Sequence, residues 1–246
     1  MENNHYQDRL YSDPQSVIRG FRFDESVAKV FDEMIHRSVP GYPDIVKMTG
    51  VLAHRYLKAG TNGYDLGCSL GTVSLVMRDM LKDRDCRIIA VDSSEAMTEK
   101  CRQNIDRHPS KVLTEVVQAR VQDVPVENAS FVVLNLVLQF IPVEERSGVI
   151  RKIFDGMRPG GALILTEKIC FSDSSEQDFA TDLYHEFKAL NGYSNLEISQ
   201  KRAALENVLI PETIQIHRER LNDAGFRQVF PWFRCFNFIS IIALKS

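Results

Sequence analysis

Short apolar runs alternate with helical patterns through the middle of the chain. The helical patterns repeat apolar residues every three or four positions, while the runs are apolar at almost every position. Uniformly apolar strands that alternate with helices indicate a mostly parallel sheet covered on both faces. The predicted strands are 62–67, 87–92, a run ending near Val121, 131–137 and 162–168, and the predicted helices between them are about 70–82, 94–107 and 143–157.

The end of the chain follows a different pattern. FRQVFPWFRCF (226–236) and NFISIIALK (237–245) are two β-rich runs with almost no residues between them. So short a connection permits only an antiparallel pair. The predicted fold is therefore α/β, a doubly wound, Rossmann-like sheet that is mostly parallel and ends in an antiparallel C-terminal hairpin. This is the layout of the class I methyltransferase-like fold.

Further helical patterns precede and interrupt this alternation. Residues 1–20 resemble a loosely ordered arm, and two amphipathic N-terminal helices follow, joined by the rigid turn PGYP at residues 40–43. A helical insertion spans about 176–209, and another helix is expected to start at Pro211. No linker divides the chain, so we expect residues 1–246 to form a single domain.

Composition narrows the class of protein. Hydrophobic residues make up 44% of the chain, charged residues 26%, and the net charge is −3, which are ordinary values for a globular protein. This balance gives no general attraction to nucleic acid, so no direct nucleic-acid binding is expected. The polar N-terminus lacks the apolar core of a secretory signal, and the run FVVLNLVLQFI is too short to span a bilayer. We therefore expect no membrane association.

The cysteines are scattered and form no CxxC pair. We interpret them as free thiols in a reducing cytoplasm, most of them small core residues. No metal site is predicted. The five positions are Cys68, Cys86, Cys101, Cys170 and Cys235.

The stretch YDLGCSLG, residues 64–71, indicates a cofactor site. An apolar strand runs into Asp65, and a glycine-containing turn then opens a helix. Gly67 lets the backbone pass close to a ligand, and Gly71 allows tight helix packing. A plain strand-to-helix turn is the alternative that the motif alone leaves open.

Asp92 ends the second predicted strand, RIIAVD. An acid at this place can accept hydrogen bonds from both hydroxyls of a ribose. The alternative is that Asp92 caps the next helix, which Ser93 or Ser94 would do equally well.

Two cofactors fit these features, a nicotinamide dinucleotide and S-adenosyl-L-methionine. The glycines are spaced GxxxG and not GxGxxG, and no second glycine is placed for a pyrophosphate. Asp65 would repel phosphates but suits the cationic amino acid end of S-adenosyl-L-methionine, which we therefore predict. RPGG (158–161), expected as a tight turn entering the fifth strand, is also typical of methyltransferase-like chains.

Asn135 interrupts the apolar end of the fourth strand, and Leu-Val-Leu follows it. Enzymes that methylate amino groups of bases often have Pro-Pro-Tyr there, so its absence argues against base methylation. We interpret Asn135 as a polar contact to the cofactor; a capping role is the alternative.

Four stretches give the chain a specific resemblance that covers nearly its whole length. With them the chain resembles the carboxy-S-adenosyl-L-methionine synthases, enzymes of bacterial wobble-uridine modification in tRNA. The last stretch, NGYSNLEISQKR followed by ALENV, is the most specific. The stretches lie at 23–42, 64–71, 127–140 and 191–208.

The resemblance implies an enzyme that is not a methyltransferase. Such enzymes use prephenate to carboxylate the methyl group of S-adenosyl-L-methionine, which yields carboxy-S-adenosyl-L-methionine and phenylpyruvate. A separate tRNA carboxymethyltransferase then places the carboxymethyl group on tRNA. The resemblance also implies a homodimer, with the N-terminal helices and the inserted segment as the expected contact surfaces.

One position departs from the family's pattern. The family usually has an acid followed by isoleucine where this chain has Arg120-Val121, and an arginine cannot accept a hydrogen bond from the adenine amine. Either the Val121 backbone and another acceptor such as Asp123 replace that contact, or adenine binds more weakly. The residues that match family binding positions are Tyr42, Gly67, Cys68, Ser69, Asp92, Ser93, Asn135 and Arg202, and Arg120 and Val121 carry over by location.

Arg202 and Tyr42 are the predicted catalytic residues. The product adds a carboxylate to a cationic cofactor, and a guanidinium holds a carboxylate through two parallel hydrogen bonds. Tyr42, in the PGYP turn, is placed to donate a further hydrogen bond. The alternative for Arg202 is a surface cation paired with Glu197 or Glu206. Lys201 is interpreted as a solvated residue.

Two other functions stay open at this point. One is an S-adenosylmethionine-dependent methyltransferase that acts on a small molecule, and the other is a non-catalytic binder of the carboxylated cofactor. The sequence identifies neither a general base nor the residues that contact prephenate. His36, His185 and His217 fall in helical segments and are interpreted as structural.

Overall fold

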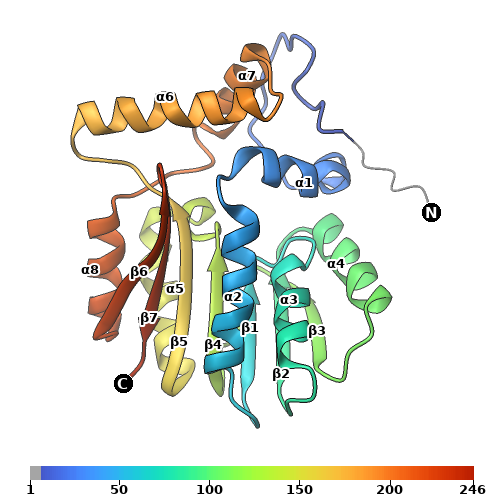
Figure 1. Ribbon diagram of the computed structural model, residues 1–246, viewed down its shortest axis with the longest axis vertical. Helices are drawn as coiled ribbons and strands as arrows, with labels where there is room; N and C mark the ends of the chain where they lie inside the picture. Colours follow the sequence, from blue (N-terminus) through green and yellow to red (C-terminus); the bar gives the residue numbers. More distant parts are fainter. Residues whose placement is uncertain (1–6) are drawn as a thin grey trace.

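A seven-stranded sheet forms the centre of residues 7–246, the part of the chain that the computed structural model describes (Figure 1). Its strand order is β3-β2-β1-β4-β5-β7-β6, and β7 pairs antiparallel with β5 and β6 while the other neighbours are parallel. The predicted α/β fold with its C-terminal hairpin is confirmed. The strands are β1 (Asn62–Leu66), β2 (Arg87–Asp92), β3 (Leu113–Gln118), β4 (Ala129–Asn135), β5 (Met157–Lys168), β6 (Gln228–Cys235) and β7 (Phe238–Leu244).

Helices cover both faces of this sheet. One face packs against α2 (Tyr42–Tyr56), α3 (Thr72–Leu81) and α4 (Glu95–Arg107), and the other against α5 (Val143–Gly156) and α8 (Ile214–Ala224). Residues 131–134 of the central strand β4 are all apolar because Phe131 and Val133 belong to the core on the first face, and Val132 and Leu134 to the core on the second. None of the helices within residues 7–246 combines the length and apolarity that crossing a bilayer requires.

A helical cap lies over the carboxyl ends of the parallel strands (Figure 1). It consists of α1 (Glu25–Ser38), α6 (Ser174–Leu190) and α7 (Asn195–Leu205). The predicted insertion at 176–209 is therefore present as two helices. Ser194 and Glu197 form a capping box at the start of α7, which explains where that helix begins.

The arm that precedes α1 is fixed to this cap. Of the predicted arm at 1–20, the first six residues lie outside the described residues, and residues 7–20 form neither helix nor strand. Nevertheless Asp8 is buried, and the side-chain amide of Gln200 makes three hydrogen bonds of 2.7 to 2.9 Å to the backbone of residues 11–15. This part of the arm is therefore irregular but attached to the cap.

Two strand predictions differ from the structure. β3 ends at Gln118 and not near Val121. RPGG (158–161) is not a turn before the fifth strand but part of β5. The strand is irregular there, because Gly160 has a φ of 75° and its N–H donates to the carbonyl of Lys245 at 2.6 Å.

Two helix boundaries also differ. The helix expected to start at Pro211 starts at Ile214, where the Thr213 side chain caps it; Glu212, just before the cap, is held by two buried arginines. PGYP is a turn only at its first two residues, because α2 begins at Tyr42. Tyr42 is thereby fixed in the first turn of a helix.

Candidate functional site

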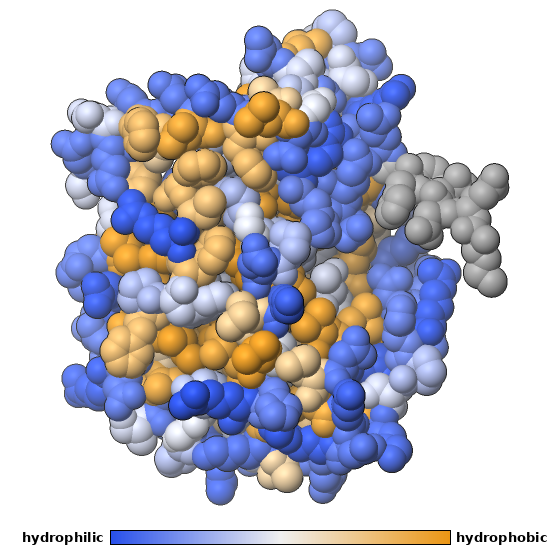
Figure 2. Space-filling view, in the orientation of Figure 1, coloured by the Kyte–Doolittle hydropathy of each residue, from blue (hydrophilic) through white to orange (hydrophobic). Residues whose placement is uncertain are grey.

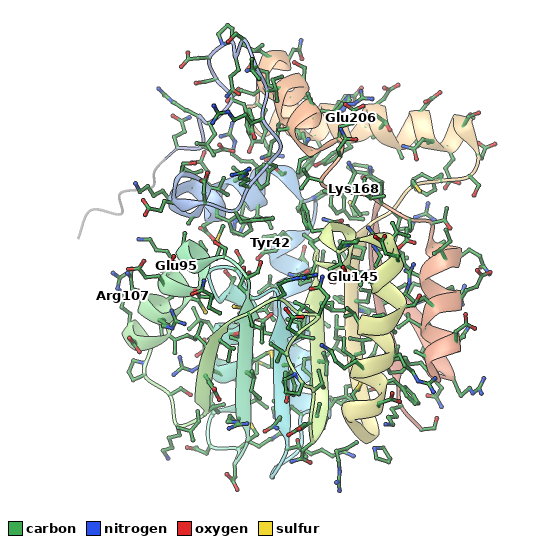
Figure 3. All side chains as sticks on the ribbon, turned by 180° about the vertical axis from the view of Figure 1, so that it is seen from behind. Tyr42, Glu95, Arg107, Glu145, Lys168 and Glu206 are labelled. Atoms are coloured by element: carbon green, nitrogen blue, oxygen red, sulfur yellow. The ribbon has the colours of Figure 1, made fainter. Side chains whose placement is uncertain are left out.

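A cavity of about 580 Å³ lies between the carboxyl edge of the sheet and the helical cap. The loops after β1, β2 and β4 line it from the sheet, and α1, α6 and α7 line it from the cap. Figure 3 shows Tyr42 on the sheet side, with Lys168 and Glu206 toward the cap. Every residue predicted to bind the cofactor or product lines this cavity: Tyr42, Gly67, Cys68, Ser69, Asp92, Ser93, Arg120, Val121, Asn135 and Arg202.

Two glycines determine the path of the loop after β1. Gly67 has a φ of 83° and Gly71 a φ of 84°, both in the left-handed region that favours glycine. A Cβ on Gly71 would lie 2.7 Å from the sulfur of Cys101, so this glycine allows the start of α3 to lie close to α4. A Cβ on Gly67 would collide with Val137, which itself lines the cavity. The loop therefore depends on glycine at both places.

Asp92 fixes this loop from the end of β2. One of its carboxylate oxygens accepts the N–H of Ser69 at 2.9 Å, and the other accepts the N–H of Ser94 at 2.9 Å. Burial raises the pKa of Asp92. The cap of α4 is Ser94, whose hydroxyl accepts the N–H of Met97 at 3.2 Å. Each carboxylate oxygen of Asp92 keeps a lone pair that can accept a further hydrogen bond from a ligand in the cavity.

Two polar side chains lie near the place where the cationic end of S-adenosyl-L-methionine is expected. Asp65 is buried and accepts a hydrogen bond from the Ser74 hydroxyl at 2.6 Å, and burial raises its pKa to about 6. The side-chain oxygen of Asn135 is buried and has no hydrogen-bond partner among residues 7–246. An unsatisfied buried acceptor costs about 1–3 kcal/mol, so a donor on a bound ligand would be stabilised there. Both residues fit a cofactor with an ammonium group.

Arg120 lies at the rim of the cavity and binds another residue. Its guanidinium donates to Glu145 at 2.9 Å, and Gln122 donates to the same carboxylate at 2.7 Å (Figure 3 labels Glu145). Asp123, the acceptor considered from the sequence, is not among the lining residues, whereas Gln122 is. The Val121 carbonyl accepts a hydrogen bond from Lys152 at 2.7 Å. Of the two replacement acceptors considered, the Val121 carbonyl therefore already accepts one hydrogen bond, and Asp123 does not reach the cavity.

Basic side chains gather at the opposite, cap side of the cavity. Lys168 ends β5, Lys188 and His185 lie on α6, and Arg202 lies on α7; all four line the cavity. Burial and nearby Arg202 lower the pKa of Lys168 to about 8, and burial together with neighbouring cations lowers the pKa of Lys188 to about 7. The sequence did not reveal this cluster, because its members come from three separate elements. The one available signal was a lysine at the carboxyl end of a central strand.

Lys201 is not the solvated residue that the sequence suggested. It is buried, and its ammonium donates to the Ser38 hydroxyl at 3.0 Å and the Tyr193 hydroxyl at 3.2 Å. Asp8 lies 3.7 Å away and forms an ion pair with it. Lys201 therefore ties α7 to α1 and to the arm.

Arg202, next in sequence, has a different environment. It forms an ion pair with neither Glu197 nor Glu206 within the described part of the chain, and Glu197 is engaged in the capping box. The alternative of a surface pairing for Arg202 is therefore absent, and its exposed guanidinium remains available to the cavity. Of the three histidines considered, only His185 lines the cavity.

Residues 7–246 contain neither a disulfide nor a cluster of metal-ligand side chains. All five cysteines are free thiols, as predicted. No group of three or more histidine, cysteine, aspartate or glutamate side chains in that range is placed to hold a metal ion.

Comparison with known proteins shows the family to which this chain is similar. A family model described as "Methyltransferase domain" matches residues 64–161. The carboxy-S-adenosyl-L-methionine synthase of Geobacter sp. (strain M21) is 52% identical over 240 residues, which cover 97% of this chain and 98% of that protein. The synthase of the same name from Hahella chejuensis is 50% identical over 244 residues, with the same coverage.

Solved structures agree on the fold. A putative S-adenosyl-L-methionine-dependent methyltransferase from Methanococcus maripaludis matches with a TM-score of 0.59 and 20% identity, covering 95% of this chain and 98% of that chain. At this identity the similarity concerns the fold alone, which is the predicted class I methyltransferase-like fold.

The buried charge of Lys188 leads to a prediction about stability. Its pKa falls from 10.5 to about 7 on folding, so between these values the unfolded chain binds more protons than the folded one. The free energy of unfolding contributed by Lys188 therefore rises with pH across this window, and below about pH 7 the cost of burying the charge is fully present. Urea unfolding of ligand-free Lys188→Met should show a variant more stable than the wild type at about pH 6, with a difference that shrinks toward pH 10.

Lys47→Met is the matched control, because Lys47 is exposed on α2 and outside the cavity. Its effect on stability should not vary with pH over the same range. A Lys188→Met variant that is less stable than the wild type at pH 6 would contradict the buried-charge interpretation.

Proposed function

The chain belongs to the carboxy-S-adenosyl-L-methionine synthase family and is an enzyme, and we propose that it takes the carboxyl group for its product from prephenate. S-adenosyl-L-methionine is its substrate, and the carboxylated sulfonium is its product. The observation that carries the proposal is the distribution of charge in the cavity. Asp65, Asp92 and the unpaired oxygen of Asn135 lie on the sheet side, whereas Lys168, Lys188 and Arg202 gather toward the cap, where Glu206 is the one acid among the lining residues. Such a cavity suits a cationic cofactor next to an anionic partner.

The cofactor would occupy the sheet side. Asp92 accepts hydrogen bonds from the ribose hydroxyls, and the loop of Gly67, Cys68 and Ser69 passes along the methionine part. Asn135 accepts a hydrogen bond from the ammonium, which satisfies its buried oxygen. Val121 and its neighbours receive the adenine at the rim. This placement directs the sulfonium methyl toward the middle of the cavity.

Arg202 and Tyr42 would hold the new carboxylate. Arg202 lines the cavity without an ion pair in the described chain, and its planar guanidinium matches the two oxygens of a carboxylate. Tyr42 is buried at the start of α2, and burial raises its pKa, so its hydroxyl stays protonated and able to donate. The methyl group of S-adenosyl-L-methionine gives Arg202 no such partner, since the only carboxylate of that cofactor is on its methionine part.

The reaction balances without a metal or an external base. When the ring carboxylate of prephenate leaves as carbon dioxide, its electron pair makes the ring aromatic and expels the ring hydroxyl as hydroxide, which leaves phenylpyruvate. The hydroxide takes a proton from the sulfonium methyl and becomes water. The resulting ylide carbon forms a bond to carbon dioxide and gives the carboxymethyl group.

The enzyme's part in this sequence is to keep the reactants together and to limit water. Carbon dioxide and the ylide are both lost if they diffuse apart or meet bulk water, so proximity in an enclosed site governs the yield. The cap over the carboxyl edge of the sheet provides that enclosure.

A mass measurement tests the proposal. Purified protein incubated with S-adenosyl-L-methionine should convert it to the carboxylated cofactor when prephenate is present and leave its mass unchanged when prephenate is absent. Phenylpyruvate should form in equal amount. The reaction is followed by mass spectrometry of the cofactor and by absorbance of phenylpyruvate.

Other outcomes of the same assay point to other functions. Loss of a methyl group from the cofactor to an added acceptor, with no need for prephenate, would indicate a methyltransferase. Retention of carboxylated cofactor without its formation would indicate a binding protein. tRNA added to the reaction should stay unmodified, because we assign the transfer to a separate tRNA carboxymethyltransferase.

A cytoplasmic location, which suits the five free thiols, is part of the proposal.

Replacing Arg202 tests the carboxylate contact. Arg202→Leu should weaken binding of the carboxylated cofactor by about 10- to 100-fold, because a charge-assisted pair is lost. Affinity for S-adenosyl-L-methionine should stay within about twofold, since that cofactor lacks the extra carboxylate. Isothermal titration with both cofactors measures the two values. Arg218→Leu, an exposed change on α8 outside the cavity, is the control. Equal affinity of Arg202→Leu and the wild type for the carboxylated cofactor would refute the contact.

We also propose a homodimer formed through the N-terminal helices and the inserted segment. Met48 and Val51 on α2 are each 40% exposed, and Phe179 and Leu190 on α6 are 66% and 89% exposed. Figure 2 shows apolar side chains gathered on the face of the molecule that carries α6. Exposed apolar side chains in such number are typical of an interaction surface.

Light scattering coupled to size-exclusion chromatography tests the dimer. The wild type should have twice the chain mass of 28.1 kDa, and a double change of Phe179 and Leu190 to lysine should give the single chain mass. Leu113→Lys is the control, because Leu113 is 72% exposed on β3, away from these helices. A wild type that elutes at the single chain mass at micromolar concentration would refute the assembly.

A further inference from the structure

We propose that Lys168 and Lys188 form a subsite for the carboxylate that the carboxyl donor keeps throughout the reaction. The inference rests on the proposed function, since it names where an anionic co-substrate binds in the same cavity. Lys168 ends β5 and Lys188 lies on α6, so the sheet and the inserted segment each contribute one ammonium group. Both residues line the cavity.

The two ammonium groups share one neutral partner. Lys168 Nζ lies 4.5 Å and Lys188 Nζ 4.3 Å from the ring centre of Tyr184. Tyr184 is buried, and burial raises its pKa, so the ring keeps its hydroxyl proton. A neutral aromatic face attracts a cation but does not cancel two positive charges. The pair therefore has a net charge that the ring leaves unbalanced.

No acid balances this charge within the described chain. The groups that shift the pKa of Lys188 are burial and the cations Lys168, Lys201 and Arg202, and no carboxylate acts in the opposite direction. For Lys168 they are burial and Arg202. Neither ammonium forms an ion pair with a residue in 7–246.

Lys201 shows the contrast. It is equally buried in the same region, but Asp8 opposes the effect of burial on its pKa, and two hydroxyls accept its protons. A lysine that serves only the structure is thus satisfied by the protein, whereas Lys168 and Lys188 lack an anion. An anion from the cavity would supply it, because buried charges require a partner.

The distribution of charge indicates that this anion belongs to a second ligand that lies beside the sulfonium cofactor, and not to the cofactor itself. Asp65 and Asp92 lie at the ends of β1 and β2, on the side of the cavity assigned to the cofactor. Lys168, Lys188 and Arg202 come from β5, α6 and α7, on the cap side. A ligand with two carboxylates can contact the lysine pair with one and Arg202 with the other.

The reaction distinguishes the two carboxylates. The one that leaves as carbon dioxide loses its negative charge in the transition state, so pairing with two ammonium groups would stabilise the ground state, and slow its loss, more than pairing with the single guanidinium of Arg202. The one that stays keeps its charge from substrate to by-product. The lysine pair therefore suits the retained carboxylate, and Arg202, which later holds the new carboxymethyl group, suits the one that is transferred.

Direct binding to a non-reacting complex tests this assignment. Protein loaded with S-adenosylhomocysteine, which lacks the methyl group, is titrated calorimetrically with prephenate and with phenylpyruvate. Lys168→Met and Lys188→Met should each weaken binding of both compounds by about 10- to 100-fold, because both compounds carry the retained carboxylate. Arg202→Leu should weaken prephenate and leave phenylpyruvate within about twofold.

Two controls separate this subsite from other roles. Lys47→Met, an exposed change on α2, should bind both compounds like the wild type. Affinity of the lysine variants for S-adenosylhomocysteine should also match the wild type, since its methionine carboxylate is not assigned to this pair. A loss of that affinity as large as the loss for prephenate would overturn the proposal, because the lysines would then hold the methionine carboxylate.

The remaining outcomes are also decisive. If the wild-type complex binds neither compound, or if the lysine variants bind both as tightly as the wild type, the subsite is refuted. Turnover of S-adenosyl-L-methionine with prephenate is measured separately. Carboxylated cofactor formed by the wild type together with unchanged binding by the lysine variants would refute the subsite and leave the proposed function intact. Binding that depends on the lysines without any carboxylated cofactor would refute the proposed function and leave the subsite intact.

Discussion

The unbalanced positive charge at the cap side of the cavity is the physical constraint that the helical cap has to accommodate. Lys168, Lys188 and Arg202 converge there from a strand and two helices, and the described chain provides no carboxylate for the lysine pair. Burying a charge such as that of Lys188 lowers stability, and a protein retains it where a ligand completes the site. The remainder of the cap compensates through ordinary packing and through the ion pair of Lys201 with Asp8.

The sheet side of the cavity suits S-adenosyl-L-methionine in general, whereas the cap side suits a particular second ligand. The loop after β1, the acid at the end of β2 and the unpaired side-chain oxygen of Asn135 suit a nucleoside with a cationic amino acid, as in S-adenosyl-L-methionine. The cap made by α1, α6 and α7 adds basic groups for which a simple methyl donor has no use. We therefore attribute chemistry beyond methyl transfer to the helices of the cap, which are added to the fold, and not to the fold itself.

The sequence predicted the architecture well because its signals are local. Apolar strands, the glycines at 67 and 71 and the C-terminal pair of runs each depend on a few neighbouring residues, and all are present as expected. Predictions failed where a distant contact decided the outcome. The helix expected from Pro211 starts later because Glu212 is held by buried arginines, and RPGG belongs to β5 because Gly160 binds the C-terminal segment.

The two neighbours Lys201 and Arg202 show the same division between sequence and structure. The sequence by itself determined the fold, the family and the residues that meet at the carboxyl edge of the sheet, because the alternation of strands and helices and the spacing of the motifs are local patterns. Only the tertiary structure decided that Lys201 is buried against Asp8, that Arg202 stays unpaired in the described chain, and that Lys168 and Lys188 share the ring of Tyr184. The physical reason is that burial and charge balance are properties of residues brought together from distant segments, and a helical pattern records the face of a helix but not what lies opposite to it.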